Sequence, residues 1–522
     1  MIKLINNMRV RASLRLLFLA AALAYFACDI TDHTLPDKII YPHYDDGVLI
    51  DQNGRMIITQ FGISWVFDRT YEYGRFANGD YWVIGPATIR AIFPGSRKIS
   101  GRTKNGSMIN PSPADGTSQG YDSACFATTY VPAMNAALNV SPKNPLVVLN
   151  GSSLVSTISL GPEGSRPQLR TAAVLTVLES APPDGGFRPP YCGNDKSVDY
   201  NVSQLTPNLG LLAELDPPGE TPDLPTIERY FERPWIDHVP GWSCGSIHPL
   251  ENMQNYGRDL SHEMGAGALT LHVNLPEGES KQTLLVRFVQ LGIDLYGVVQ
   301  NGGRENWHND GGHAGGRKWP ILFAGIMLGD AGMQAIGSRS GDYLYDGDYG
   351  PGNIPGDYIH FGEDDQTFYV TADDIALGSV VTENPGGCSG SFHGHHYPPD
   401  CVDYPEYAAS DLGLPEWGIR HASSPLNDGN TWNAAYRDCC TAISWTGFVL
   451  AARIMGAHTS LWNHPALFDY QDRYMAVTAA EDMAPAWRYS TDQLIEDSWG
   501  SHPGWRPGGF VGEMWDAYRD SY

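Results

Sequence analysis

The chain has 522 residues, of which 42% are apolar and 18% are charged, so it is globular rather than disordered and long enough for two domains. Its formal net charge of −25 repels nucleic acid and anionic membrane surfaces, which excludes both as expected partners. The 14 Trp and 27 Tyr residues exceed the needs of a core, and such flat side chains suit sugar rings. The net charge does not exclude a polysaccharide as ligand, even an acidic one, if the protein binds it in a locally basic cleft.

The first 28 residues have the pattern of a signal peptide. Four basic residues precede an apolar run of twelve residues from Leu16 to Ala27, which is too short to cross a membrane. No later stretch is apolar enough to span one. We therefore expect a secreted or periplasmic protein, with lipoprotein anchoring at Cys28 or an uncleaved anchor as alternatives.

Residues 45–180 have the signals of short strands separated by turns, which predicts an antiparallel β-sandwich-like domain. The β-branched or aromatic runs are 48–50, 56–59, 63–67, 81–84, 146–149 and 173–178. Between them, the turn within Gly74–Pro86 carries Arg75, Asn78, Asp80, Tyr81 and Trp82. These side chains either face a ligand or belong to a hairpin with a buried Trp.

Proline and glycine cluster in residues 181–225, which predicts a linker or crossing segment. Five polar or aromatic residues in it are second-tier candidates for the wall of a cleft between domains. They are Arg188, Tyr191, Asn194, Asp195 and Lys196.

Residues 226–522 change to a helical period, which predicts an α/α-helical domain arranged as a toroid or barrel. The expected helices are 250–274, a stripe at 284–299, a helix from Pro320, and 432–456, 465–479 and 491–499. The fold class expected for the whole chain is therefore α+β multidomain, with the sheet domain first.

The segment Gln300–Asp330 combines a glycine-rich polar half with an apolar helical half that begins at Trp319-Pro320. Glycine lets a backbone approach a ligand closely, and polar loops mounted on a buried element often carry catalytic groups. Its candidate residues are Trp307, His308, Asn309, Asp310, His313, Arg317, Lys318 and Trp319. A solvated connection with chance polar residues is the alternative.

Two further clusters belong to the helical half. The first holds His238, His248, Asn252, Tyr256 and Arg258, of which Asn252 and Tyr256 are four residues apart and would share one helix face. The second includes Arg420 and His421 before Trp432, Asn433 and Arg437. We expect His248, Trp307, His308, Asn309, Arg317, Lys318, Trp319, Arg420 and His421 to bind substrate, with Trp307 and Trp319 as stacking platforms.

Proton abstraction beside a sugar carboxylate requires a base, a cation or amide that neutralises the carboxylate, and an acid for the leaving oxygen. His313 or Tyr256 would be the base, Tyr256 the acid, and Asn252 with Arg258 or Arg317 the carboxylate site. In residue types and element order, the helical half resembles the α/α-toroid polysaccharide lyases, such as alginate lyases and heparinases. The resemblance implies β-elimination on a uronate-containing polysaccharide.

The domain order favours a different reaction, because those lyases commonly place the helical domain first. A leading sandwich followed by helices is more similar to inverting glycoside hydrolases with an α/α barrel. Such enzymes need two carboxyl groups. Asp310 and Glu513 would supply them, with Asp237, Asp346 and Asp348 as competitors. A non-catalytic glycan-binding surface protein is a further alternative.

No cofactor is expected to be required. His393, His395 and His396 are candidates for zinc, and Asp342, Asp346 and Asp348 for calcium, but neither group has the spacing of a defined motif. Seven Cys residues follow the signal, and Cys388 with Cys401 is the expected disulfide. For vicinal Cys439 and Cys440 we expect packing rather than redox chemistry.

Overall fold

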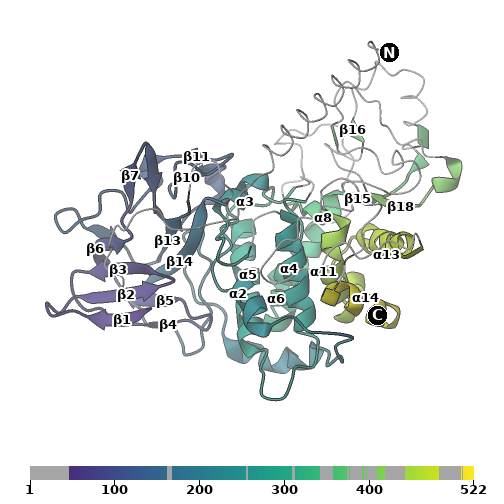
Figure 1. The fold of residues 1–522 in the computed structure, drawn as a ribbon, viewed down its shortest axis with the longest axis horizontal. Coiled ribbons are helices and arrows are strands. Elements are labelled where there is room, and N and C mark those ends of the chain that lie inside the picture. The colour runs from purple at the N-terminus through teal and green to yellow at the C-terminus, as the bar shows by residue number, and fades with distance from the viewer. Residues whose placement is uncertain are drawn as a thin grey trace, which may run out of the picture. The chain divides into compact units, whose positions relative to one another are not determined.

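A sheet-rich N-terminal part precedes a helical C-terminal part, which confirms the α+β class (Figure 1). The structure is a computed structural model that describes residues 46–161, 167–253, 257–308, 312–340, 357–372, 375–376, 391–392, 395–396, 408–417, 441–480, 507 and 509–522. The predicted signal peptide lies outside these residues. Within them, no helix combines the length and apolar character needed to cross a membrane.

The first sheet has five strands in the order β1-β2-β3-β6-β12, and each neighbouring pair is antiparallel. Its strands are β1 (Gly47–Ile50), β2 (Met56–Gln60), β3 (Ile63–Phe67), β6 (Ala87–Phe93) and β12 (Leu146–Val148). The turn between β1 and β2 forms because the Asp51 carboxylate accepts hydrogen bonds from the backbone N–H groups of Asn53 and Arg55, at 2.8 and 3.0 Å. The predicted strands in this region are confirmed.

The second sheet has the order β4-β5-β14-β13-β9. Its strands are β4 (Tyr73–Arg75), β5 (Tyr81–Ile84), β14 (Leu169–Leu178), β13 (Ser152–Ser159) and β9 (Ser107–Ile109). Two separate two-stranded sheets are formed by β7 (Arg97–Ile99) with β8 (Arg102–Lys104) and by β10 (Ser118–Gln119) with β11 (Thr129–Tyr130). β14 runs parallel to β5, so the prediction of purely antiparallel pairing is wrong here. Most of the sheet-rich part separates these strands in sequence, and parallel neighbours need such a long crossover.

Strand β14 is buried on both faces, which explains its nearly continuous apolar sequence. Ala173, Leu175 and Val177 belong to the same apolar cluster as side chains of the first sheet. Ala172 and Val174 point the opposite way and belong to the cluster that includes the helices. Side chains alternate between the faces of a strand, so a strand covered on both sides has no polar face. The second sheet therefore has the first sheet on one side and helices on the other.

The helical part contains α2 (Leu224–Tyr230), α3 (Cys244–Ile247), α4 (Gly257–Thr270), α5 (Gln282–Gln300), α6 (Lys318–Leu328), α7 (Ala331–Gln334), α8 (Gly362–Asp365), α11 (Ala442–Ile454), α12 (Ala457–Ser460), α13 (Pro465–Ala480) and α14 (Gly509–Tyr518). Short strands β15 (Thr367–Tyr369) and β18 (Pro415–Trp417) pair with each other, as do β16 (Ser391–Phe392) and β17 (His395–His396). Helices α4 and α11 cross closely, since a Cβ on Gly447 would lie 2.8 Å from the backbone of Gly265.

The helix predicted from the apolar stripe at 284–299 is confirmed as α5, and the one predicted at Pro320 as α6. The helix predicted over 250–274 is wrong at its start, because α4 begins at Gly257. The helix predicted at 491–499 lies outside the described residues.

A buried arginine of the crossing segment joins the two parts of the chain. Arg188 donates to Asp80 of the sheet part at 2.6 Å and to both carboxylate oxygens of Asp294 on α5, at 2.9 and 2.5 Å. Arg188 and Tyr191 are fully buried, so they do not line a cleft as predicted. Asp80 also accepts hydrogen bonds from Gln60 and Asn78, and its carboxylate faces inward rather than toward a ligand.

Candidate functional site

The glycine-rich segment contacts the first residue of α4. A Cβ added to Gly257 would lie 2.1 Å from both the Gly312 carbonyl oxygen and the His313 Cα, so only glycine allows this approach. Arg258 follows on α4, where it is nearly buried and its Nε lies 3.2 Å from Asp259 Oδ1. His313 is half-buried. The contact therefore brings the stretches that carry a predicted base and a predicted cation to one place.

The same segment contacts α8 on another side. A Cβ on Gly362 would lie 3.2 Å from Ala314, and the Gly316 N–H donates to Glu363 Oε2 at 2.9 Å. Burial, together with the neighbouring Asp364, raises the pKa of Glu363 to about 7. Its other oxygen, Oε1, accepts no hydrogen bond from the part of the chain that the structure describes. A carboxyl group with this pKa can give or take a proton near neutral pH.

A third side is formed where residues 304–308 pair with residues 358–361. The His360 N–H donates to the Arg304 carbonyl at 2.8 Å, and the rings of Trp307 and Phe361 stack with centroids 5.8 Å apart. His360 Nδ1 lies 2.6 Å from Asp365 Oδ2. Sequence reasoning missed His360, Glu363 and Asp365. The only local signal is a histidine closely followed by three acidic residues in HFGEDD.

Two of the predicted substrate-binding cations are instead part of the buried core. Arg317 donates to Asp237 at 2.8 Å and to the Gly315 carbonyl at 2.8 Å, and Lys318 donates to Asp364 at 2.5 Å and to the Trp462 carbonyl at 2.6 Å. Both side chains are fully buried. The predicted substrate-binding role of both residues, and the uronate-carboxylate role predicted for Arg317, do not fit these positions, because each charge is already neutralised inside the protein.

The predicted role of Asn252 is wrong for a similar reason. This residue precedes α4, and its amide is used by the backbone of Arg233, whose N–H donates to Oδ1 at 3.2 Å and whose carbonyl accepts from Nδ2 at 3.1 Å. Asn252 is fully buried. Its side chain holds the loop that precedes the helix, so the helix face that it was predicted to share with Tyr256 does not exist.

The predicted aromatic and imidazole contacts to substrate are also buried. Trp307 and Trp319 are both 0% exposed, so neither offers a platform to a sugar ring. Trp319 stacks on Trp462 at 6.3 Å instead. His248 is buried against Trp235, and burial lowers the pKa of its imidazole to about 3, which keeps it neutral. Of the predicted binding residues that the structure describes, His308 is half-buried and stays a candidate.

Glu513 lies near the C-terminal end of α4, whereas the glycine-rich segment contacts its N-terminal end. A Cβ on Gly219 would be 2.1 Å from Glu513 Oε2, and nearby Asp216 accepts a hydrogen bond from Asn274, just past the C-terminal end of α4. The glycine-rich segment contacts Gly257 at the opposite end, and a helix of this length spans about 20 Å. Paired catalytic carboxyl groups stand roughly 5 to 10 Å apart, so Glu513 is not placed to act with a group on that segment.

Several predicted residues lie outside the described residues. They are Tyr256, Asn309, Asp310, Asp342, Asp346, Asp348, His393, Arg420, His421, Trp432, Asn433 and Arg437, with Cys388, Cys401, Cys439 and Cys440; for His395 and His396 the structure describes the strand but not the side chains. Across the described ranges, no group of three or more His, Cys, Asp or Glu side chains is arranged to hold a metal ion. Cys125 and Cys192 are buried free thiols, and Cys244 is buried near the guanidinium of Arg317.

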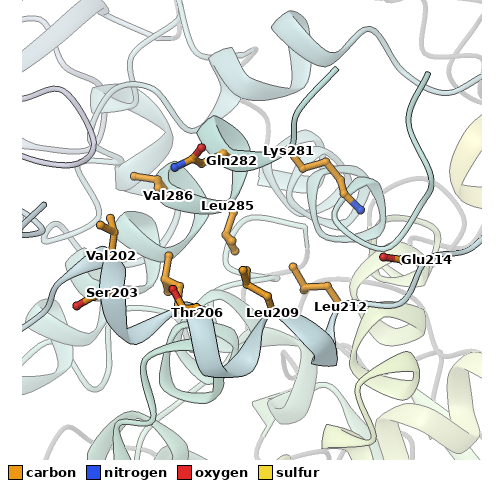
Figure 2. A pocket seen from close by; sticks show the side chains of 11 residues that line it. Val202, Ser203, Thr206, Leu209, Leu212, Glu214, Lys281, Gln282, Leu285 and Val286 are labelled. Atoms are coloured by element: carbon orange, nitrogen blue, oxygen red, sulfur yellow. The ribbon is translucent and has the colours of Figure 1, made fainter. Parts of the chain in front are cut away.

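A groove of about 550 Å³ lies elsewhere, between residues 202–212 and the start of α5 (Figure 2). Its floor is formed by leucine and valine side chains, and Lys281 and Glu214 lie at one end. Lys281 donates to the carbonyls of Leu271 and Val273, both at 2.8 Å, so its ammonium caps the chain after α4. Most of the side chains that line the groove are apolar, and we place the candidate site at the glycine-rich segment.

No protein-family model, curated protein or solved structure matches this chain. Its function therefore has to be inferred from the groups that surround Gly312–Lys318.

Proposed function

We propose that the protein is an exported enzyme that depolymerises a uronate-containing polysaccharide by β-elimination. The observation that carries this proposal is the contact of Gly257 with Gly312 and His313, because it joins an imidazole-bearing loop to a helix start that carries Arg258. We further propose that the two sheets form a β-sandwich and that the helices form an α/α toroid around this site.

In this proposal His313 removes the proton from the carbon beside the uronate carboxylate. Arg258 is the proposed cation for that carboxylate, although its Nε lies 3.2 Å from Asp259 Oδ1, because Arg317 and Lys318 make shorter ion pairs of 2.8 and 2.5 Å with Asp237 and Asp364. Histidine suits the role of base, because it is the side chain that most readily gains and loses a proton between pH 5 and 8.

The test is to incubate the protein with polyuronates such as alginate, polygalacturonate and heparin, and to record the ultraviolet absorbance of the unsaturated product. We expect His313→Ala to reduce the rate by roughly 10²-fold or more, as removal of a general base does. His458→Ala is the matched control, because His458 is a half-buried histidine on α12, away from this segment. Equal rates for the two variants would refute the role of His313.

The second candidate function is inverting hydrolysis by an α/α-barrel glycosidase, and Glu363 is the observation that favours it. A carboxyl group whose pKa is raised to about 7 is suited to be the general acid of such an enzyme. Reducing ends that form without the ultraviolet chromophore would support this function. Glu363→Gln should then abolish the release of reducing ends, whereas Glu263→Gln, which alters another buried carboxyl with a raised pKa, should not.

A further inference from the structure

We infer that His360, positioned by Asp365, is the general acid that protonates the leaving oxygen in the proposed β-elimination. The inference rests on the proposed function and adds to it a residue that no sequence pattern indicated. It starts from the pairing of residues 304–308 with residues 358–361, which places His360 beside the glycine-rich segment.

The His360–Asp365 pair has the geometry of an oriented imidazole. Asp365 is the last residue of α8, and its Oδ2 lies 2.6 Å from His360 Nδ1, a distance typical of a charge-assisted hydrogen bond. The ring of Tyr358 meets the imidazole edge-on, with centroids 5.0 Å apart. Because Asp365 occupies Nδ1, a proton given to a substrate leaves from Nε2.

The surroundings favour the protonated imidazole. The charged groups that act on His360 are Asp365 on α8, and Glu305 and Arg304 on the paired segment. Burial lowers the pKa of the imidazole, but Asp365 and Glu305 outweigh burial and Arg304, so the net direction is upward. An acid must hold its proton at the working pH, and an upward shift of the pKa favours the protonated form.

The pair also lies close to the predicted base. Gly362, two residues after His360, packs against Ala314, which follows His313. His360 itself is 2% exposed and its Nε2 is buried, whereas Arg304, Glu305 and Tyr358 beside it are half-buried, so the proposal requires these covering side chains to move when a substrate oxygen reaches Nε2. His313 and His360 thus flank one contact between the glycine-rich segment and α8.

The chemical step balances without a co-reactant. His313 takes the proton from the carbon beside the carboxylate, and the electron pair of that C–H bond forms a carbon–carbon double bond. The bond from the adjacent carbon to the leaving oxygen breaks, and that oxygen takes the proton from His360 Nε2. The products are one unsaturated chain end and one hydroxyl end, and solvent returns each histidine to its starting protonation state.

The decisive experiment compares two substrates in His360→Gln. On a polyuronate, whose leaving group is a sugar alkoxide, we expect the turnover number to fall by roughly 10²-fold or more with little change in KM. On a uronate that carries a nitrophenyl ether at the position β to the carboxylate, elimination releases nitrophenolate, which needs no protonation to leave, so His360→Gln should keep the wild-type rate to within about threefold. His313→Ala should lose activity on both substrates, because the base is needed in either case.

The role of Asp365 is tested by the pH profile of Asp365→Asn. Removal of the carboxylate lowers the pKa of His360, so the alkaline limb of the rate profile should move to lower pH by about one unit. His464→Gln, which changes another buried histidine near α8, should leave that limb in place. If His360→Gln does not fold, the position of the alkaline limb of the pH–rate profile in Asp365→Asn tests the acid role of His360.

The outcomes separate the two proposals. Wild-type protein that forms no unsaturated product from any polyuronate would overturn the lyase function and this assignment with it. An active wild type whose His360→Gln variant loses both substrates equally, or neither, would overturn the acid role alone. An unmoved alkaline limb in Asp365→Asn would do the same.

Discussion

Replacement of Arg188 by methionine should destabilise the protein more than any loss of a surface charge. Arg188 makes three charged hydrogen bonds of 2.5 to 2.9 Å with Asp80 and Asp294, and all three side chains are buried. Arg188→Met leaves two carboxylates without their cation. Loss of one partner from a buried ion pair costs about 3–5 kcal/mol, so we expect a loss in the free energy of unfolding at the upper end of that range.

The assay is urea and thermal unfolding, followed by circular dichroism. Arg75→Met is the matched control, since Arg75 is an exposed arginine that lies 4.4 Å over the ring of Tyr81, a contact of about 0.5–1 kcal/mol. The triple variant R188M/D80N/D294N removes the unpaired charges and should recover most of the loss. A loss below about 1 kcal/mol in Arg188→Met, or no recovery in the triple variant, would show that this ion pair does not hold the two parts together.

Two further perturbations test the packing around the site. Burial lowers the pKa of four imidazoles, those of His238, His248, His262 and His272, from 6.5 to about 3. Below pH 6.5 the unfolded chain binds protons at these imidazoles that the folded protein does not, so they should lower the free energy of unfolding by roughly 2 kcal/mol per histidine between pH 6.5 and 5. The raised pKa values of buried Glu263 and Glu363 act in the opposite direction but are fewer, so the net free energy of unfolding should still fall. Equal urea midpoints at pH 7 and pH 5 would contradict this. Gly257→Ala should reduce activity on polyuronates at least tenfold, because its Cβ would lie 2.1 Å from the Gly312 carbonyl oxygen and must displace the loop that carries His313. Gly210→Ala, where a Cβ would meet nothing within 4 Å, is the control, and similar activity in both variants would argue against a site at this contact.

Local patterns were enough to predict some of the regular elements, whereas others, such as β6, β13 and α8, were not predicted. The turn at Asp51–Gly54 and the β-branched runs beside it predict β1 and β2 because the turn chemistry and the strand preference are properties of neighbouring residues. The apolar stripe at 284–299 predicts α5 because the 3.6-residue period shows which face will be buried.

The chemical state of the polar residues was decided by tertiary structure alone. Arg317 and Lys318 belong to a glycine-rich loop that indicates ligand binding, yet their charges are neutralised by Asp237 and Asp364, which lie 80 and 46 residues away in sequence. The carboxylate partner of His360 is only five residues away in sequence, but His360 lies beside the glycine-rich segment only because that segment pairs with residues 358–361. The hydrophobic pattern of a segment indicates which of its faces is exposed to solvent. Whether a polar side chain is buried or paired with an opposite charge depends on side chains from other elements of the fold.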